Sequence, residues 1–190
     1  MIIFITGGAR SGKSQYAVDL ASKESGDVLF LATCIPRDEE MKQRVEEHRK
    51  NRPKDWKTLE EEKDILSILK DCQSDVVVID CLTLLLSNLL LGEDDVREAI
   101  KGLVEFLKEA SFTTIIVSNE VGSGIVPENE MARRFRDISG WANQLMARYA
   151  DEVYFMVSGI PIKIKVSTHK IGERPEIKSN HRGTEFTENL

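Results

Sequence analysis

Residues 2–14 read IIFITGGARSGKS, and this stretch decides the fold of the chain. Residues 7–14 fit the pattern G-x-x-x-x-G-K-[ST], between a short run of β-branched and aromatic residues and a segment that can continue as a helix. In such a strand-loop-helix unit, glycines let successive backbone N–H groups face an anion, and the helix N-terminus adds a favourable dipole. The stretch therefore predicts a phosphate-binding loop that opens an α/β domain.

Each residue of the predicted loop has an expected chemical role. We expect all of them to contact nucleotide phosphates: Gly7, Gly8, Ala9, Arg10, Ser11, Gly12, Lys13 and Ser14. The Lys13 amine is expected to reach the β- and γ-phosphates as a catalytic group, and the Ser14 hydroxyl to bind Mg²⁺. A second metal ligand is expected at Asp80, which ends the apolar run 75–80, because a buried strand of this kind delivers a carboxylate to the magnesium ion beside the phosphates.

Composition limits the class of protein. The chain has 190 residues, of which 41% are apolar and 31% charged, as in a soluble globular domain. Its net charge of −6 argues against nucleic-acid and anionic-membrane partners, which reward a basic surface. Three cysteines without a C-x-x-C spacing suggest neither a disulfide framework nor a zinc site, so a reducing cytoplasm is the expected location. The apolar run 81–91 is about half the length needed to span a bilayer, so we expect a buried helix and no stable membrane insertion.

Strands and helices alternate along the rest of the chain. We expect further strands at 27–33, 75–80, 113–118 and 151–157, an antiparallel edge strand at 162–166, and helices at 38–51, 59–72, 81–91, 93–110 and 128–150. The segment 53–58 is expected to be a loop. This alternation predicts a three-layer α/β/α domain over residues 1–166 with a mostly parallel sheet. Residues 167–190 are polar and are expected to form a flexible tail.

The residue patterns leave the roles of several charged or titratable residues open. In the helix 38–51, Met41, Val45 and His48 share one stripe, but a helical histidine is more often structural than nucleophilic. Glu120 is expected to bind metal through water, to act as a base, or to cap a turn. The arginines of the helix 128–150 are expected to be solvated, to lie at a subunit contact, or to face phosphate; they are Arg133, Arg134 and Arg136.

Motifs along the body of the chain resemble those of one family, the bifunctional adenosylcobinamide kinase and adenosylcobinamide-phosphate guanylyltransferase of cobalamin biosynthesis. The resemblance covers about residues 2–165, and its most specific parts are the string NEVGSGIVP at 119–127 and the string HRKNRP at 48–53. The other parts are the phosphate-binding loop, Ala32-Thr33, Trp56, Thr58, Glu60, Asp80-Cys81-Leu82-Thr83, Arg134, Arg136-Asp137, Gly140 and Val157-Ser158-Gly159. The tail beyond about residue 165 departs from the pattern.

The resemblance implies a RecA-like fold, a homotrimer and two reactions. In the first, ATP or GTP phosphorylates the aminopropanol hydroxyl of adenosylcobinamide. In the second, GMP passes from GTP to His48 with release of pyrophosphate, and then to adenosylcobinamide phosphate, giving adenosylcobinamide-GDP. The implied GTP contacts outside the loop are Thr33, Cys34, Ile35, Arg49, Lys50, Asn51, Arg52, Glu60 and Asp80.

The chemistry of these residues agrees with the implied reactions. A neutral imidazole can attack an α-phosphorus, and nearby arginines favour the unprotonated form and hold phosphates. The Glu60 carboxylate would accept hydrogen bonds from the N1 and N2 donors of guanine. Three alternatives stay open: a simple P-loop kinase in which His48 is structural, a RecA-like nucleotide-binding module, and a guanylyltransferase without the kinase step.

Overall fold

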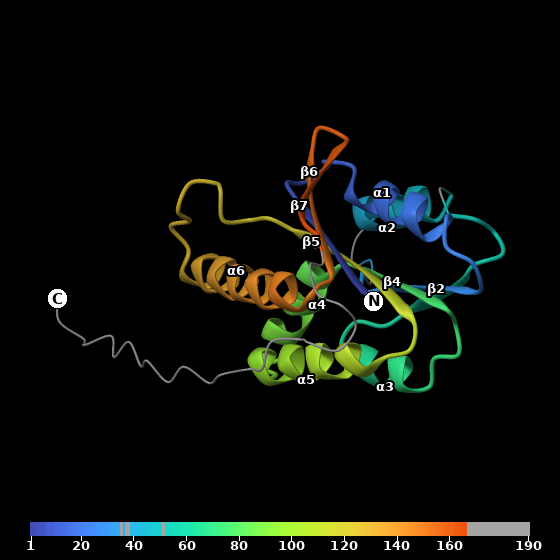
Figure 1. Cartoon of the computed structure of the whole chain (residues 1–190). Coiled ribbons are helices and arrows are strands. Elements are labelled where there is room, and N and C mark those ends of the chain that lie inside the picture. The colour runs from blue at the N-terminus through green and yellow to red at the C-terminus, as the bar shows by residue number, and fades with distance from the viewer. Residues whose placement is uncertain (35, 37–38, 51, 167–190) are drawn as a thin grey trace.

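The computed structural model describes residues 1–34, 36, 39–50 and 52–166, without the side chains at positions 40, 41, 44, 47 and 48 (Figure 1). Its strands are β1 (Ile2–Gly7), β2 (Val28–Ala32), β3 (Lys57–Glu60), β4 (Val76–Asp80), β5 (Thr113–Asn119), β6 (Glu152–Val157) and β7 (Ile160–Lys165). Its helices are α1 (Lys13–Ala21), α2 (Glu39–Lys50), α3 (Ile65–Lys70), α4 (Leu82–Leu91), α5 (Val96–Glu109) and α6 (Glu130–Tyr149). The predicted tail 167–190, together with Ile35 and Asn51, lies outside the described residues.

The described strands form one sheet in the order β3-β2-β4-β5-β1-β6-β7. All neighbouring pairs are parallel except β6 and β7, which pair antiparallel at one edge. The predicted mostly parallel sheet with an antiparallel edge strand is therefore confirmed. In this order β5 lies between β1, which carries the phosphate-binding loop, and β4, which ends at Asp80.

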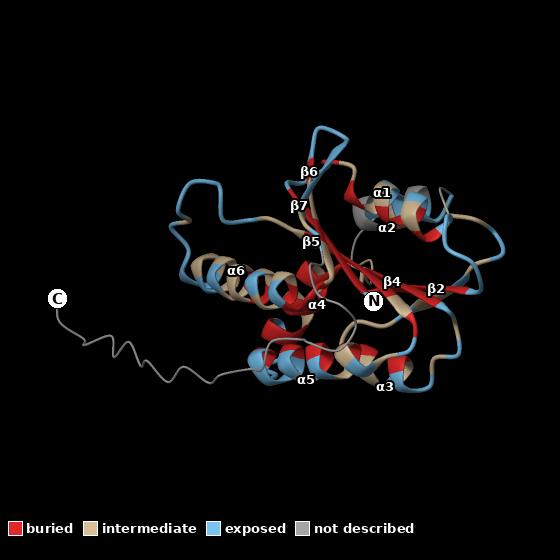
Figure 2. Cartoon of the chain, viewed as in Figure 1, coloured by how far each residue is buried: buried red, intermediate tan, exposed pale blue. Residues whose placement is uncertain are grey.

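Helices cover both faces of the sheet, which gives the predicted three layers (Figure 1). Helices α1 and α2 lie on one side, and α3 to α6 lie on the other. Successive residues of a strand point to opposite faces. Thus Ile3 and Ile5 of β1 join the core under α1, whereas Ile2 and Phe4 join the larger core under α3 to α6. Figure 2 shows this burial concentrated in the sheet and on the inner sides of the helices.

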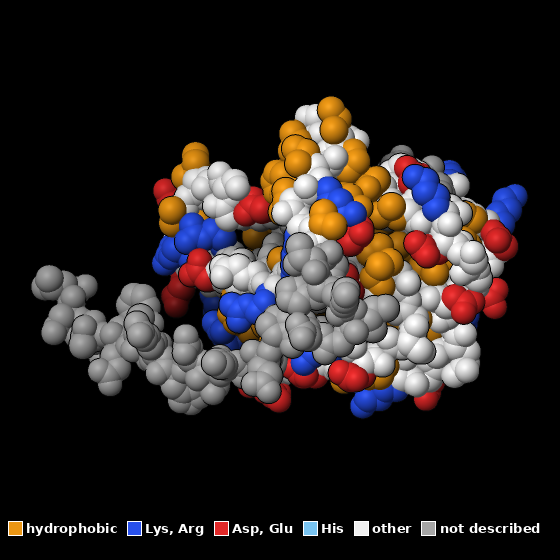
Figure 3. All heavy atoms as spheres, viewed as in Figure 1, with side chains coloured by type: hydrophobic (Ala, Val, Ile, Leu, Met, Phe, Trp, Pro, Cys, Tyr) orange, Lys and Arg blue, Asp and Glu red, His pale blue; other side chains and the backbone are white. Residues whose placement is uncertain are grey.

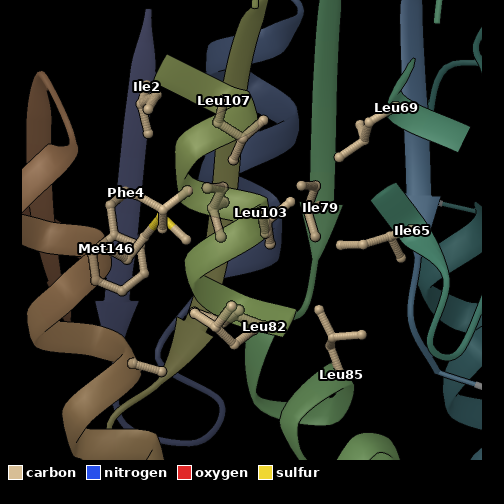
Figure 4. Close-up of a cluster of buried hydrophobic side chains, with 14 of the residues drawn as sticks. Ile2, Phe4, Ile65, Leu69, Ile79, Leu82, Leu85, Leu103, Leu107 and Met146 are labelled. Carbon is tan, nitrogen blue, oxygen red and sulfur yellow. The ribbon is translucent and has the colours of Figure 1, made fainter. Parts of the chain in front are cut away.

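The apolar run 82–91 forms α4, as predicted, and supplies much of the larger core (Figure 4). Leu82, Leu85 and Leu86 are almost completely buried there, beside Ile79 of β4. Truncation of such a side chain to alanine typically costs about 2–5 kcal/mol. Among the described residues, no helix is both long and apolar enough to cross a membrane.

The predicted boundaries around β3 are wrong. Residues 57–58 were assigned to a loop and 59–72 to one helix, but Lys57–Glu60 is a strand parallel to β2, and the helix α3 is limited to Ile65–Lys70. The Asp64 side chain caps α3 by accepting a hydrogen bond from the Ser67 N–H. Pairing with the exposed edge of β2 overrides the helical preference of this segment.

Candidate nucleotide-binding site

The predicted phosphate-binding loop joins β1 to α1 at the carboxyl end of the sheet. Gly7 pairs with Asn119 of β5 on one side and Met156 of β6 on the other. A Cβ atom on Gly7 would lie 2.6 Å from the Met156 carbonyl oxygen, so only glycine fits between the neighbouring strands. Gly12, at the N-terminus of α1, has φ +92°, a left-handed conformation that glycine adopts without strain.

A turn of the β6–β7 hairpin supports this loop. The Gly159 N–H donates a hydrogen bond of 3.0 Å to the Ser11 carbonyl. A Cβ atom on Gly12 would lie 3.3 Å from the Gly159 Cα atom, so the two backbones approach closely. The string Val157-Ser158-Gly159, which the sequence singled out without a role, thus holds the loop in place.

Lys13 lies buried beneath the loop. Its Nζ donates hydrogen bonds to the Gly8 carbonyl at 2.6 Å and the Ser11 Oγ at 3.4 Å. Burial lowers the pKa of Lys13, while the nearby Cys81 and Asp80 oppose that shift. The amine is therefore held at the centre of the loop, where an incoming phosphate can exchange with these backbone and hydroxyl partners.

A cleft of about 560 Å³ opens between the loop, the strand ends and α2. It is lined by Arg10, Ser11, Gly12, Lys13, Ser14, Gln15, Val18, Phe30, Ala32, Cys34, Val45, Arg52, Asp80, Cys81, Leu84, Val117 and Asn119. Eight predicted site residues thus meet in one cleft, five from the loop together with Cys34, Arg52 and Asp80. Gly7, Gly8, Ala9, Thr33, Arg49, Lys50 and Glu60 do not belong to this lining.

Arg52 follows α2 and enters the cleft. Its guanidinium carbon lies 3.6 Å from the centroid of the Phe30 ring. Its NH1 atom is buried and has no hydrogen-bond partner in the described part of the chain. Burial lowers the pKa of Arg52, and the negative charge of Asp80 acts in the opposite direction. A buried cationic donor without a partner is suited to an anionic ligand.

Thr33 is fully buried and serves the protein backbone. Its hydroxyl donates to the Cys81 carbonyl at 2.7 Å and accepts from the Cys81 N–H at 2.8 Å. The Asn88 side chain of α4 donates to the Thr33 carbonyl at 3.0 Å. The Thr33 side chain is therefore turned to the β4–α4 junction, where it fixes the position of Asp80 and Cys81, and is not presented to a ligand.

Arg49 and Glu60 lie together outside the cleft lining. They form an ion pair at 2.5 Å between the Arg49 NH2 and Glu60 Oε1 atoms, and both side chains are partly exposed. Lys50 is exposed. The pair joins the end of α2 to the end of β3, so two residues predicted separately as nucleotide contacts are neighbours in space.

The His48 side chain lies outside the part of the chain that the structure describes, and its backbone belongs to α2. Val45, one helical turn earlier, lines the cleft. Ile35 and Asn51, two further predicted nucleotide contacts, lie outside the described residues.

The residues predicted to hold Mg²⁺ fit that ion chemically. Ser14 and Asp80 both line the cleft and offer hydroxyl and carboxylate oxygens. Within the described residues, no group of three or more His, Cys, Asp or Glu side chains is arranged to hold a metal ion. Mg²⁺ is usually bound by one or two carboxylates together with substrate phosphates and water, and the Asp80 carboxylate with the Ser14 hydroxyl is compatible with that preference.

The structure supports one interpretation of Glu120, the capping of a turn. Its carboxylate accepts hydrogen bonds from the Gly122 N–H at 2.7 Å and the Ser123 N–H at 3.2 Å, and these bonds with Ser123 and Gly122 lower its pKa. Glu120 therefore caps the turn that follows β5.

The arginines of α6 are also placed. Arg133 donates to the carbonyls of Pro127 and Glu128, and Arg136 pairs with its neighbour Asp137. Arg133 and Arg134 border a second, charged groove between the starts of α5 and α6, and neither they nor Arg136 line the nucleotide cleft.

Sequence reasoning missed Asn119 as a cleft residue. It included Asn119 in the string 119–127 that carries the family resemblance, but gave the Asn119 side chain no role. The available signal was its position at the end of an apolar strand, as Asp80 ends β4.

Comparison with known proteins identifies the family. A sequence model of the family described as cobinamide kinase / cobinamide phosphate guanyltransferase matches residues 3–164. The bifunctional adenosylcobalamin biosynthesis protein CobU of Escherichia coli (strain K12) is 40% identical over 182 residues, which cover 87% of this chain and 100% of that protein. This chain belongs to the family.

A second relative has a different name. The bifunctional adenosylcobalamin biosynthesis protein CobP of Pseudomonas aeruginosa is 42% identical over 166 residues, 85% of this chain and 95% of that protein. The recognised resemblance is thus confirmed, and the chain is an enzyme of this family.

A solved structure supports the fold. A prototypical ATPase from the type III secretion system of pathogenic bacteria superposes with a TM-score of 0.52 at 18% identity, over 85% of this chain and 56% of that one. At this identity the likeness concerns the fold alone, and it confirms the predicted RecA-like P-loop architecture.

Proposed function

We propose that this chain phosphorylates the aminopropanol hydroxyl of adenosylcobinamide with ATP or GTP, and then transfers GMP from GTP to the product through His48. The observation that carries the proposal is the shared cleft, to which the loop contributes Lys13 and the α2 region contributes Val45 and Arg52. One bound triphosphate can therefore meet both the phosphate-binding loop and the helix that carries His48.

In the kinase step, the acceptor hydroxyl oxygen forms a bond with the γ-phosphorus. The bond from that phosphorus to the β–γ bridging oxygen breaks, the hydroxyl proton passes to solvent, and a nucleoside diphosphate leaves. Lys13 and Arg52 are suited to stabilise the negative charge on the phosphates, because both are cationic and partly withdrawn from water. Mg²⁺ held by Ser14 and Asp80 would neutralise further phosphate charge.

In the guanylyl transfer, a neutral His48 nitrogen forms a bond with the α-phosphorus of GTP as pyrophosphate leaves. An oxygen of adenosylcobinamide phosphate then attacks the same phosphorus, and the phosphorus–nitrogen bond breaks to release adenosylcobinamide-GDP. The covalent intermediate divides one difficult transfer into two easier ones. Val45 lines the cleft one turn before position 48, which supports this role for α2.

Glu60 is proposed to select guanine by accepting hydrogen bonds from its N1 and N2 donors. In this structure the carboxylate pairs with Arg49, so the ion pair would hold Glu60 in place at the edge of β3. A Glu60→Gln protein should lose its preference for GTP over ATP, because the amide replaces one acceptor with a donor. An unchanged preference would remove this assignment.

The chain is proposed to form a homotrimer in the cytoplasm. Apolar side chains are exposed along the β6–β7 hairpin, where Figure 3 shows hydrophobic atoms gathered. They are Val157, Ile160, Ile162, Ile164 and Val166. Burial against another copy would remove this surface from water. Sedimentation equilibrium should give three times the mass of the chain, and Ile160→Asp with Ile162→Asp should lower it; a monomeric wild type would contradict the proposal.

The central test uses GTP labelled at the α-phosphate, with Mg²⁺, on the wild type and on His48→Ala. Acid-labile, base-stable label on the wild type alone is expected. A wild type that phosphorylates adenosylcobinamide without becoming labelled would instead support a simple kinase in which His48 is structural.

A further inference from the structure

A closed set of buried and partly buried hydrogen bonds surrounds the end of β5. The Thr83 Oγ1 lies 3.2 Å from the Ser118 Oγ, and the Ser118 hydroxyl donates to the Asn143 Oδ1 at 2.7 Å. The Asn143 Nδ2 donates to the Asn119 carbonyl at 3.1 Å, and the Asn119 N–H donates to the Thr83 Oγ1 at 2.6 Å. The set joins α4, β5 and α6 through side chains far apart in the sequence.

This network fixes the backbone of Asn119. Both its N–H and its carbonyl are bound, and the next residue, Glu120, donates its N–H to the Gly7 carbonyl at 2.9 Å. Thr83 and Ser118 are at least 96% buried, so water does not compete well for these bonds. A backbone held in this way fixes the point from which the Asn119 side chain projects.

Asn119 lies in the cleft lining, next to the start of the phosphate-binding loop. Asn119 lines the cleft and pairs in register with Gly7, the first residue of the phosphate-binding loop. Because β5 lies between β1 and β4, Asn119 is placed between the loop and the strand that ends at Asp80. A carboxamide at this point offers an N–H donor without adding charge beside the Lys13 amine.

We propose that the Asn119 side chain donates a hydrogen bond to a γ-phosphate oxygen of the bound triphosphate, and that Thr83, Ser118 and Asn143 position it for this contact. The inference deepens the proposed kinase step and rests on that step. Asn119 contacts a non-bridging oxygen that stays with the transferred phosphoryl group, and it neither gains nor loses a proton. A donor fixed before the reaction stabilises the charge of the transition state without reorganisation.

The test compares Asn119→Ala and Asn119→Asp with the wild type. Two quantities are measured: kcat for phosphorylation of adenosylcobinamide, and the ratio of the Kd values for GDP and the non-hydrolysable triphosphate GMPPNP. Asn119→Ala should lower kcat roughly 10- to 100-fold, since loss of one fixed donor in an active site has effects of about that size or larger. It should weaken GMPPNP binding while the Kd for GDP, which lacks the γ-phosphate, stays within about twofold. Asn119→Asp should be worse than Asn119→Ala, because its charge repels the γ-phosphate.

The positioning role is tested on α6. Asn143→Ala removes the bond to the Asn119 carbonyl and should shift the GMPPNP-to-GDP discrimination in the same direction as Asn119→Ala, which a loss of stability alone would not do. The matched control is Gln144→Ala, which truncates the exposed neighbouring amide of the same helix and should leave both quantities unchanged.

Two results would overturn the inference. One is an Asn119→Ala protein that retains wild-type discrimination between GMPPNP and GDP; the other is equal weakening of both ligands, which would indicate a general effect on the loop. A wild type that binds GMPPNP but does not phosphorylate adenosylcobinamide would contradict the proposed function, while the binding ratio would still decide the role of Asn119.

Discussion

Replacing Arg52 with methionine should weaken nucleotide binding without weakening the fold. The Arg52 guanidinium stacks on Phe30 with 3.6 Å between its central carbon and the ring centroid, and its buried NH1 lacks a hydrogen-bond partner among the described residues. Methionine is a flexible apolar side chain that can keep the contact with the ring. The substitution therefore removes the charge and the unpaired donor while largely preserving the packing.

The expected change in the free energy of unfolding follows from two opposing effects, and the expected change in Kd follows from one lost hydrogen bond. In the ligand-free protein, loss of the cation–π contact costs about 0.5–2 kcal/mol. Removal of a buried donor without a partner relieves about 1–3 kcal/mol. We expect the free energy of unfolding to fall by no more than about 1 kcal/mol relative to the wild type. In the complex, loss of a hydrogen bond to a charged group costs about 1.5–3 kcal/mol, a roughly 10- to 150-fold rise in the Kd for GTP.

Urea denaturation measures the free energy of unfolding, and calorimetric titration with GTP and Mg²⁺ measures the Kd for GTP. The matched control is Arg97→Met, because Arg97 also stacks on an aromatic ring, 4.6 Å from the centroid of Trp141, but does not line the cleft. Its Kd for GTP should stay within about twofold of the wild type. The reasoning is refuted if Arg52→Met binds GTP as the wild type does, or if it unfolds more than about 2 kcal/mol more easily.

Three further predictions concern the loop and its surroundings. Gly7→Ala should destabilise the fold by about 1–3 kcal/mol, because the added Cβ atom meets the Met156 carbonyl oxygen. Gly8→Ala should change the free energy of unfolding by less than about 0.5 kcal/mol, because the space around Gly8 is open. Equal effects of the two variants in urea denaturation would contradict this geometry. Lys13→Met should lower kcat/KM for phosphorylation at least about 100-fold, and steady-state kinetics with near-normal values would remove Lys13 from the catalytic group. Burial, with a smaller effect of Asp80, raises the pKa of Cys81 to about 12. At about pH 9 its neutral thiol should therefore escape alkylation by iodoacetamide in the native protein and react after unfolding. Rapid labelling of native Cys81 in mass spectrometry would contradict this prediction.

Sequence patterns were sufficient to predict those helices, strands and loops whose characteristic residues all lie within one segment of the chain. The phosphate-binding loop, the apolar helix α4 and the strands β4 and β5 were predicted because their residues carry the pattern themselves. The strand β3 was not predicted, because none of its four side chains is buried and its pairing with β2 defines it. A short edge strand has little hydrophobic alternation to detect.

The sequence by itself determined the class of fold, the phosphate-binding loop and the placing of Ser14 and Asp80 at one edge of the sheet, since each depends on a short pattern and on the rule that parallel strands end at one edge. Only the tertiary structure decided which polar side chains face the cleft. It turned the Thr33 hydroxyl toward Cys81, paired Arg49 with Glu60, and placed Asn119 in the lining. The physical reason is that a polar side chain takes whichever partner the packed elements bring within hydrogen-bond distance. Such a partner can lie far away along the sequence, as Cys81 lies 48 residues from Thr33.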